Sequence, residues 1–279
     1  MNSLFRWSAA AVFSCLCISP CAGQSRIEES GCRDVRVLES TIHACLSGTG
    51  RVTVVLAAGA GLTNRTWAAV VQALRRDARV LSFDRPGLGQ SPPGPLPRTP
   101  TQIAHELRAL VIAMDIRGPL ILVGHSMGGV HVLRYASLHP AQVQAIITLD
   151  TPPPGFEEAR LKLLTKEERI ERRRIRGDGL NSAPEVARHE REGSELPGEW
   201  QFLDFPRQLP LTVVVADSQN FGDLGSTEEH RQLWISESRR WLALSDQSSL
   251  VIAKESGHMI HRDQSDLVID LIERVLASR

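Results

Sequence analysis

Short apolar runs alternate with helix-like patterns along most of the chain. The runs lack polar alternation and are rich in β-branched and aliphatic residues, which is typical of strands buried on both faces of a sheet. Strands that alternate with crossover helices indicate an α/β fold with a mostly parallel sheet. A predicted N-terminal hairpin brings the total to about eight strands. The runs are residues 52–56, 80–83, 120–123, 145–149, 212–215 and 250–253.

The helical segments carry start signals and packing faces. Thr99 is a candidate N-cap, followed by Pro100 and by Gln102 as a capping-box residue. Apolar residues then recur at spacings of three and four up to position 114, which places them on one helix face. A similar stripe over residues 267–275 predicts the last helix. Packing explains these faces, and we assign them no chemistry.

One segment interrupts the alternation of strands and helices. Residues 152–210 hold no strand-like run and include the charge run 172–174 among apolar residues. Such a run is usually the solvated face of a helix, with an anion-binding patch as the alternative. We therefore expect a helical lid over residues 152–206, inserted into a core made of residues 24–151 and 207–279.

Composition restricts the partners of the protein. The 279 residues include 32 basic and 32 acidic side chains, and 42% of residues are hydrophobic, as in ordinary folded proteins. This balance creates no overall field that would attract nucleic acid or an anionic membrane surface. A small-molecule substrate or ligand is the expected partner, and no nucleic-acid binding is predicted.

The first residues differ in character from the rest. Arg6 precedes an apolar run at 7–18, and small residues follow at 21–23. This pattern predicts a signal peptide over residues 1–23 and export to the periplasm or the medium. The run is about 12 residues, shorter than the roughly 20 that a membrane-spanning helix needs. An N-terminal tail and lipid anchoring at Cys21 are the less favoured interpretations.

Export changes how the cysteines are interpreted. Three of the five cysteines lie in the predicted signal peptide, which leaves Cys32 and Cys45. They flank two strand-like runs, 35–38 and 41–44, so a hairpin would place them opposite one another. A disulfide between them would stabilise the fold by about 3 kcal/mol. Two inert buried thiols are the alternative.

Residues 124–129 read Gly-His-Ser-Met-Gly-Gly and lie between a predicted strand and a helical run at 130–138. Gly-x-Ser-x-Gly in this context is the pattern of a nucleophile elbow, in which a strained turn exposes the serine hydroxyl. The glycines allow backbones to approach closely. Ser126 is the predicted nucleophile, and a bystander serine in a glycine-rich turn is the alternative.

A serine hydroxyl needs a nearby base at neutral pH, and histidine has a suitable pKa. The order in this arrangement is serine, acid, histidine, so the base comes late in the chain. His258 follows the last predicted strand and is the predicted general base. His261 is interpreted as a packing or loop-surface residue, and His125 is expected to point away from the serine's side.

Three aspartates are candidates for the acid that orients the histidine. Asp150 ends the strand at 145–149, whereas Asp217 and Asp223 follow the strand at 212–215. All three lie at carboxyl ends of strands, where catalytic groups collect in α/β sheets. We favour Asp150 over Asp217 and Asp223. A helix cap or a turn residue is the alternative role for each.

An oxyanion hole needs two backbone N–H donors. Met127, the residue after the nucleophile, is expected to supply one of them. The second is expected from the glycine-containing loop at 57–61, with Ala60 as the donor. A plain glycine turn is the alternative interpretation of that loop.

Together these motifs resemble the α/β-hydrolase superfamily. Further matching segments are 58–61 with Trp67, 83–91, His139 with the following proline, and 256–261. They spread over most of the chain beyond the leader. The resemblance implies a mostly parallel eight-stranded sheet with helices on both faces, a lid after the sixth strand and no cofactor. It also implies hydrolysis through an acyl-enzyme.

Two positions depart from the pattern of the family. Ala58 stands where many relatives have histidine. Gln219 stands where many relatives carry the acid after the seventh strand. Relatives that use the end of the sixth strand instead would place the acid at Asp150, which is the main reason for preferring it.

The leading hypothesis is an exported, cofactor-independent serine hydrolase that cleaves a carboxylic ester, with Ser126, Asp150 and His258 as its triad. Amides, thioesters and lactones share the same acyl-transfer chemistry. A non-catalytic small-molecule receptor on the same fold is the alternative from another class. No metal site is predicted, and the oligomeric state is left open.

Overall fold

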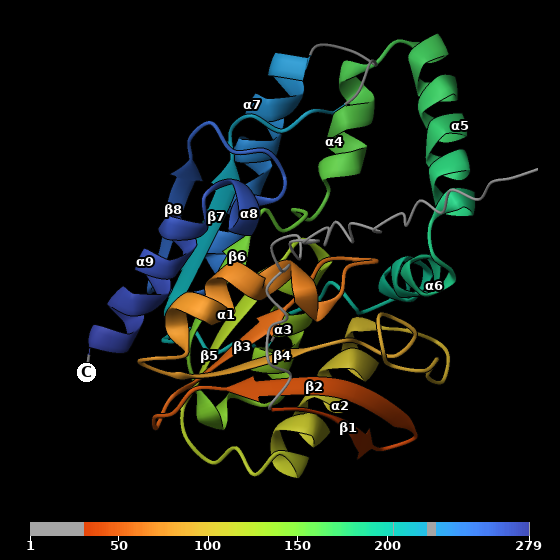
Figure 1. The fold of residues 1–279 in the computed structure, drawn as a ribbon. Coiled ribbons are helices and arrows are strands. Elements are labelled where there is room, and N and C mark those ends of the chain that lie inside the picture. Colours follow the sequence, from red (N-terminus) through yellow and green to blue (C-terminus); the bar gives the residue numbers. More distant parts are fainter. Residues whose placement is uncertain (1–30, 203, 222–226, 279) are drawn as a thin grey trace, which may run out of the picture. The chain divides into compact units, whose positions relative to one another are not determined.

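A computed structural model describes residues 31–202, 204–221 and 227–278. Its strands are β1 (Cys32–Val37), β2 (Ser40–Ser47), β3 (Thr53–Ala57), β4 (Arg79–Phe83), β5 (Leu120–His125), β6 (Val143–Leu149), β7 (Leu211–Ala216) and β8 (Ser248–Ala253). They form one eight-stranded sheet in the order β1-β2-β4-β3-β5-β6-β7-β8 (Figure 1). Strand β2 runs antiparallel to both β1 and β4, and the other pairings are parallel. The predicted α/β architecture is confirmed.

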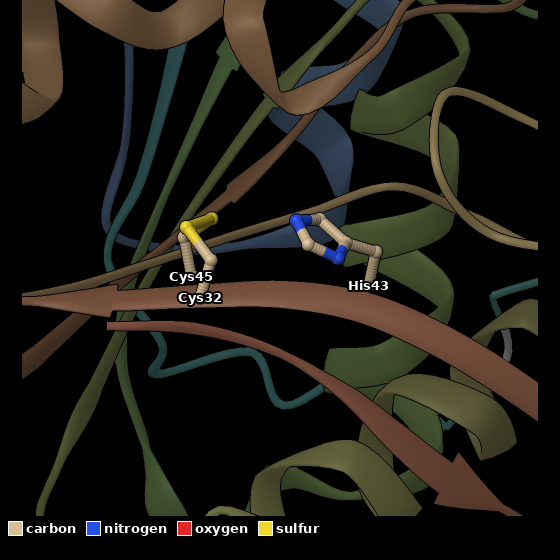
Figure 2. Close-up of side chains that lie close together, drawn as sticks. All are labelled: Cys32, His43 and Cys45. Atoms are coloured by element: carbon tan, nitrogen blue, oxygen red, sulfur yellow. A yellow bond between two sulfur atoms is a disulfide. The ribbon is translucent and has the colours of Figure 1, made fainter. Parts of the chain in front are cut away.

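The predicted N-terminal hairpin lies at one edge of this sheet. Cys32 pairs in register with Cys45, and their sulfur atoms form a disulfide as expected (Figure 2). His43 lies beside the disulfide, with its Nδ1 2.9 Å from Asp34 Oδ1. The two sulfurs and this imidazole lie within 4.8 Å of one another, but the disulfide occupies both sulfurs. This cluster therefore offers a metal ion a single imidazole.

Helices cover both faces of the sheet. The apolar run of β3 does not alternate with polar residues because both faces of the strand are buried. Its successive residues Val54 and Val55 belong to hydrophobic clusters on opposite faces of the sheet. Helices α1 and α9 pack on one cluster, and α2 and α3 pack on the other. None of the helices in the described ranges is long and apolar enough to cross a bilayer. The α-helices are α1 (Ala68–Leu74), α2 (Pro100–Ala113), α3 (Met127–Leu138), α4 (Phe156–Leu163), α5 (Lys166–Ser182), α6 (Glu185–Ser194), α7 (Thr227–Ser238), α8 (Ile260–Asp263) and α9 (Ser265–Ala277), with short 3-10 turns η1 (Asn64–Trp67), η2 (Pro140–Gln142) and η3 (Arg239–Leu244).

The predicted start of α2 is confirmed. Thr99 adopts an extended backbone, and its Oγ1 accepts a hydrogen bond from the backbone N–H of Gln102 at 3.0 Å. Pro100 is the first helical residue, where its missing N–H costs no hydrogen bond. The last helix, α9, buries Val268 and Ile272 from the predicted apolar stripe. Local sequence therefore sets the start of α2 and the packing face of α9.

Helices α4, α5 and α6 fill the segment between β6 and β7, and its described residues include no strand (Figure 1). Arg174 pairs along α5 with Glu171 at 2.6 Å and with Asp178 at 2.7 Å, and all three side chains are exposed. Arg172 pairs with Glu157 of α4 at 3.1 Å. These pairs are those of a solvated helix face, which is how the sequence was interpreted. The role of the segment as a lid stays a prediction.

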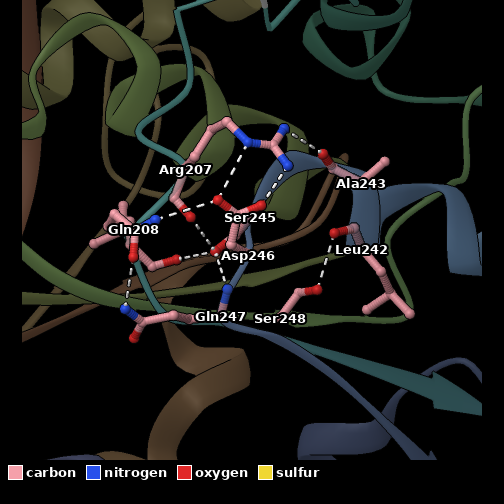
Figure 3. A network of polar contacts seen from close by, with 9 residues as sticks. Arg207, Gln208, Leu242, Ala243, Ser245, Asp246, Gln247 and Ser248 are labelled. Carbon is pink, nitrogen blue, oxygen red and sulfur yellow. Dashed lines mark hydrogen bonds and ion pairs between the residues drawn. The ribbon is translucent and has the colours of Figure 1, made fainter.

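A polar network joins the segments that lead into β7 and β8 (Figure 3). The hydroxyl oxygen of Ser245 lies 2.6 Å from the carbonyl oxygen of Leu209 and 3.0 Å from that of Arg207. Arg207 also forms an ion pair with Asp246 and accepts a hydrogen bond from its backbone N–H at 2.8 Å. The network holds together the two segments from which the parallel strands β7 and β8 begin.

Candidate active site

Ser126 stands between the end of β5 and the start of α3, where the sequence predicted the elbow. Its backbone angles are φ 52° and ψ −127°, a region that residues with side chains rarely adopt. The Ser126 N–H donates to the carbonyl oxygen of Leu149 in β6 at 2.8 Å, which anchors the turn to the neighbouring strand. The chain therefore has the strained strand-to-helix turn that an elbow requires.

Two glycines allow this turn to pack tightly. A Cβ atom on Gly124 would lie 2.4 Å from the carbonyl oxygen of Gly128. A Cβ atom on Gly128 would lie 2.2 Å from the carbonyl oxygen of Ala57. Carbon and oxygen atoms cannot approach so closely without displacement of the backbone. Strands β3 and β5 and helix α3 therefore meet at this distance because both positions are glycine.

Asp150 directly follows β6, and its side chain is completely buried. Its Oδ2 atom lies 2.7 Å from Nδ1 of His258, in the segment between β8 and α8. Its Oδ1 atom accepts hydrogen bonds from the backbone N–H of Ala216 at 3.1 Å and from the indole N–H of Trp234 at 2.7 Å. These contacts hold the carboxylate in one orientation. With its proton on Nδ1, the imidazole of His258 is oriented in turn, and Nε2 can face a reacting group.

Asp217, the second candidate for the acid, has other hydrogen-bond partners than Asp150. Asp217 Oδ1 accepts hydrogen bonds from the hydroxyl of Ser218 at 2.8 Å and from the backbone N–H of Glu255 at 2.7 Å. The bond from Glu255 joins the turn after β7 to the turn after β8. Within the described residues, no hydrogen bond connects Asp217 to His258. Asp223 lies outside the described residues.

Three histidines meet beside the elbow. The ring of His125 lies 4.7 Å from that of His258 and 4.5 Å from that of His261, measured between ring centroids. His125 Nε2 also lies 2.8 Å from the carbonyl oxygen of His258. His125, which directly precedes Ser126, therefore supports the segment that carries His258. Sequence reasoning missed this contact, and the place of His125 inside the elbow motif was the one local signal for it.

His261 is a packing residue in the structure. Its Nε2 lies 2.6 Å from Oγ1 of Thr66, and its ring packs at a tilt of 36° against Trp67, with centroids 4.4 Å apart. Burial lowers the pKa of His261 to about 3, and nearby positive charges act in the same direction. Burial also holds the pKa of His125 well below its usual value. Both imidazoles are therefore neutral at physiological pH.

The loop after β3 packs against the elbow. A Cβ atom on Gly59 would lie 3.1 Å from Cβ of Ser126 and 2.9 Å from Nδ1 of His125, so glycine permits the approach. Ala60 is the next residue of this loop, and Met127 is the first residue of α3. Within the described part of the chain, neither of their N–H groups donates to a backbone carbonyl. The role of these two amides as oxyanion donors stays a prediction.

Comparison with known proteins decides the family. Residues 54–271 match the model of the alpha/beta hydrolase family. The chain is an α/β hydrolase. This finding confirms the resemblance seen in the motifs and establishes a hydrolase fold for the sheet and helices described above.

Individual relatives of this α/β hydrolase have low sequence identity to it but match most of its length. The uncharacterised protein YqjL of Bacillus subtilis is 26% identical over 223 residues, which cover 79% of this chain and 82% of YqjL. Esterase Rv0045c of Mycobacterium tuberculosis is 24% identical over 281 residues, covering 88% of this chain and 89% of the esterase. A solved thermophilic esterase from Thermogutta terrifontis superposes with a TM-score of 0.63 and 21% identity, covering 88% of this chain and 97% of its own. The similarity therefore extends over the whole hydrolase fold.

Proposed function

We propose that this α/β hydrolase is a serine hydrolase that cleaves carboxylic esters. The observation that carries the proposal is the 2.7 Å contact between Asp150 Oδ2 and His258 Nδ1, beside the elbow that presents Ser126. Because His125 contacts the His258 ring and precedes Ser126 in the chain, the serine and the imidazole belong to one small region. A buried carboxylate, an oriented imidazole and an alcohol on a strained turn are the components of a catalytic triad.

In the proposed mechanism, His258 removes the proton from the Ser126 hydroxyl as the oxygen attacks the ester carbonyl. The N–H groups of Ala60 and Met127 stabilise the negative charge of the tetrahedral intermediate. His258 then returns the proton to the leaving alcohol, which leaves an acyl-enzyme. Water attacks this acyl group by the same route and releases the carboxylic acid. Asp150 keeps the imidazole in the correct tautomer throughout.

Two features support the choice of an exported esterase. The similar proteins Rv0045c and the Thermogutta enzyme are both described as esterases. The disulfide between Cys32 and Cys45 is of a kind that persists in oxidising compartments, in agreement with export through the predicted leader at residues 1–23.

Covalent labelling tests the nucleophile. A fluorophosphonate probe reacts with activated serines, so wild-type protein is expected to be labelled and to hydrolyse p-nitrophenyl butyrate. Ser126→Ala should lose both properties while keeping its circular dichroism spectrum. Folded wild-type protein that takes no label and turns over no ester would support a receptor on this fold instead.

The acid is tested by a matched pair of substitutions. Asp150→Asn presents an amide to Nδ1 of His258 and favours the wrong tautomer, so kcat is expected to fall on the order of 10⁴-fold. Asp217→Asn alters a turn and should leave kcat near the wild-type value. Steady-state kinetics with p-nitrophenyl esters measures both variants. A large loss in Asp217→Asn with little loss in Asp150→Asn contradicts the assignment.

A further inference from the structure

A buried ion pair joins helix α6 to the loop that carries Ala60. Arg85 follows β4, and its Nε and Nη2 atoms donate to the two carboxylate oxygens of Glu190 in α6 at 2.6 and 2.8 Å. The side chain of Arg85 is 2% exposed and that of Glu190 is 0% exposed. Charges buried so deeply are costly unless they are paired, so each side chain holds the other in place.

The same guanidinium also binds the backbone of the loop. Its Nη1 donates to the carbonyl oxygen of Ala58 at 2.6 Å, and its Nη2 donates to that of Gly59 at 2.9 Å. The carbonyl of Gly59 and the N–H of Ala60 belong to one planar trans peptide group, in which they point in opposite directions. The same carbonyl accepts a longer hydrogen bond from the Leu62 N–H at 3.2 Å, and Arg85 supplies the shorter contact that fixes the direction of the Ala60 N–H.

We propose that Arg85 and Glu190 are positioning residues of the oxyanion hole. Arg85 aims the Ala60 N–H at the developing negative charge, and Glu190 fixes the orientation of Arg85. A hydrogen bond to the Gly59 carbonyl also polarises the peptide group and strengthens its N–H as a donor. This inference rests on the proposed function, because an oxyanion hole has a task only if the protein catalyses acyl transfer.

A second buried ion pair serves as a matched control, because we assign it a structural role alone. Arg98 donates to both carboxylate oxygens of Glu106 at 2.7 and 2.8 Å, and these side chains are 1% and 2% exposed. Glu106 also accepts a hydrogen bond from the hydroxyl of Ser40 at 2.9 Å. Among the contacts of the described residues, none ties this second ion pair to the backbone at 58–60.

The test compares Arg85→Met/Glu190→Met with Arg98→Met/Glu106→Met in the full chain. Each double variant removes a whole pair, so no buried charge is left unpaired. For the first, kcat for p-nitrophenyl butyrate should fall about 100-fold or more, with KM within about threefold, as on loss of an oxyanion donor. Affinity for a phenyl trifluoromethyl ketone, whose serine adduct carries the same negative charge, should fall by a similar factor. The second variant should lower Tm and keep kcat within about threefold.

Arg85→Lys supplies a further measurement that does not depend on the folding of the double variant. Lysine keeps the positive charge but lacks the planar fork, so kcat is expected to fall roughly tenfold. Wild-type kcat in Arg85→Lys, or equal losses of kcat in the two double variants, overturns the inference. Wild-type protein without esterase activity or fluorophosphonate labelling overturns the proposed function and the inference together. An active wild type with unaffected Arg85 variants overturns the inference alone.

Discussion

At the residue scale, environment separates two histidines that lie three positions apart. His258 is half-buried and contacts the carboxylate of Asp150. His261 is 1% exposed, packs against Trp67 and has its pKa lowered to about 3 by burial. A group that stays neutral across the physiological range stabilises the fold through packing and is unsuited to proton transfer at neutral pH. This contrast supports His258 as the proposed general base.

The lowered pKa of His261 predicts a pH dependence of stability. In the unfolded chain its imidazole takes up a proton near pH 6.5, whereas in the folded protein it stays neutral down to about pH 3. The unfolded state therefore binds more protons between these values, and stability falls as the pH is lowered through this window. The contribution of this histidine is up to about 1.4 kcal/mol per pH unit.

Urea unfolding at pH values from 7 to 4.5 measures this dependence. His261→Gln should lower stability at pH 7 and should lose less of it on acidification than the wild type. His189→Gln, which changes a half-buried histidine of α6, serves as the control and should keep the wild-type slope. If the unfolding free energy of His261→Gln depends on pH as steeply as that of the wild type, another group causes the loss of stability at acidic pH.

Some site residues could be predicted because their signals are local. Ser126 lies in a short motif, and His258 follows the last strand. Trp234 carries no such signal, and although Arg85 lies in the matching segment 83–91, that motif does not predict its partner. The contacts of these residues with Asp150 and Glu190 span 84 and 105 positions along the chain. Contacts at these separations depend on how α7 and α6 dock, which no periodicity or motif encodes.

At the element scale, glycine allows β3, β5 and α3 to meet. In Gly128→Ala the new Cβ atom would lie 2.2 Å from the carbonyl oxygen of Ala57, so the strand or the helix must move. Overpacking of this kind typically costs about 1–3 kcal/mol, and we expect a similar loss of stability together with loss of esterase activity. Thermal unfolding and ester turnover measure the two effects.

Gly177→Ala is the matched control for this substitution. Gly177 lies within α5, and a Cβ atom there would meet none of the described atoms within 4 Å. Alanine favours the helix over glycine by roughly 0.5–1 kcal/mol, so this variant should be as stable as the wild type or more stable. Equal destabilisation by both substitutions would contradict the packing explanation for Gly128.

Most strands and helices could be predicted from the sequence. Strands buried on both faces leave continuous apolar runs, and those runs were found. Their ends were less certain: the run at 52–56 corresponds to β3 at Thr53–Ala57, which extends to pair Ala57 with Gly124. Strand ends depend on hydrogen-bond partners in other strands, and these partners are fixed by the assembled sheet.

At the scale of the whole molecule, the leader and the disulfide make a joint prediction. Expression of the full chain in a bacterial host should give exported protein that begins at Gln24 and lacks free thiols, because Cys32 and Cys45 are bonded. Intact mass and thiol titration measure both properties. Cys32→Ser/Cys45→Ser should unfold at lower urea concentration, with a loss of about 3 kcal/mol. Recovered protein that starts at Met1 with free thiols would exclude this route.

The position of Asp150 at the end of β6 has a consequence for how such a protein can diversify. Its partners are His258, the amide of Ala216 and the indole of Trp234, so none of the described residues 217–221 after β7 enters the proposed triad. Asp217 and Ser218 bond to the turn after β8, but the described residues 219–221 can vary while the proposed chemistry persists. New substrate preferences could arise there by drift, and an engineer could graft foreign segments at the same place.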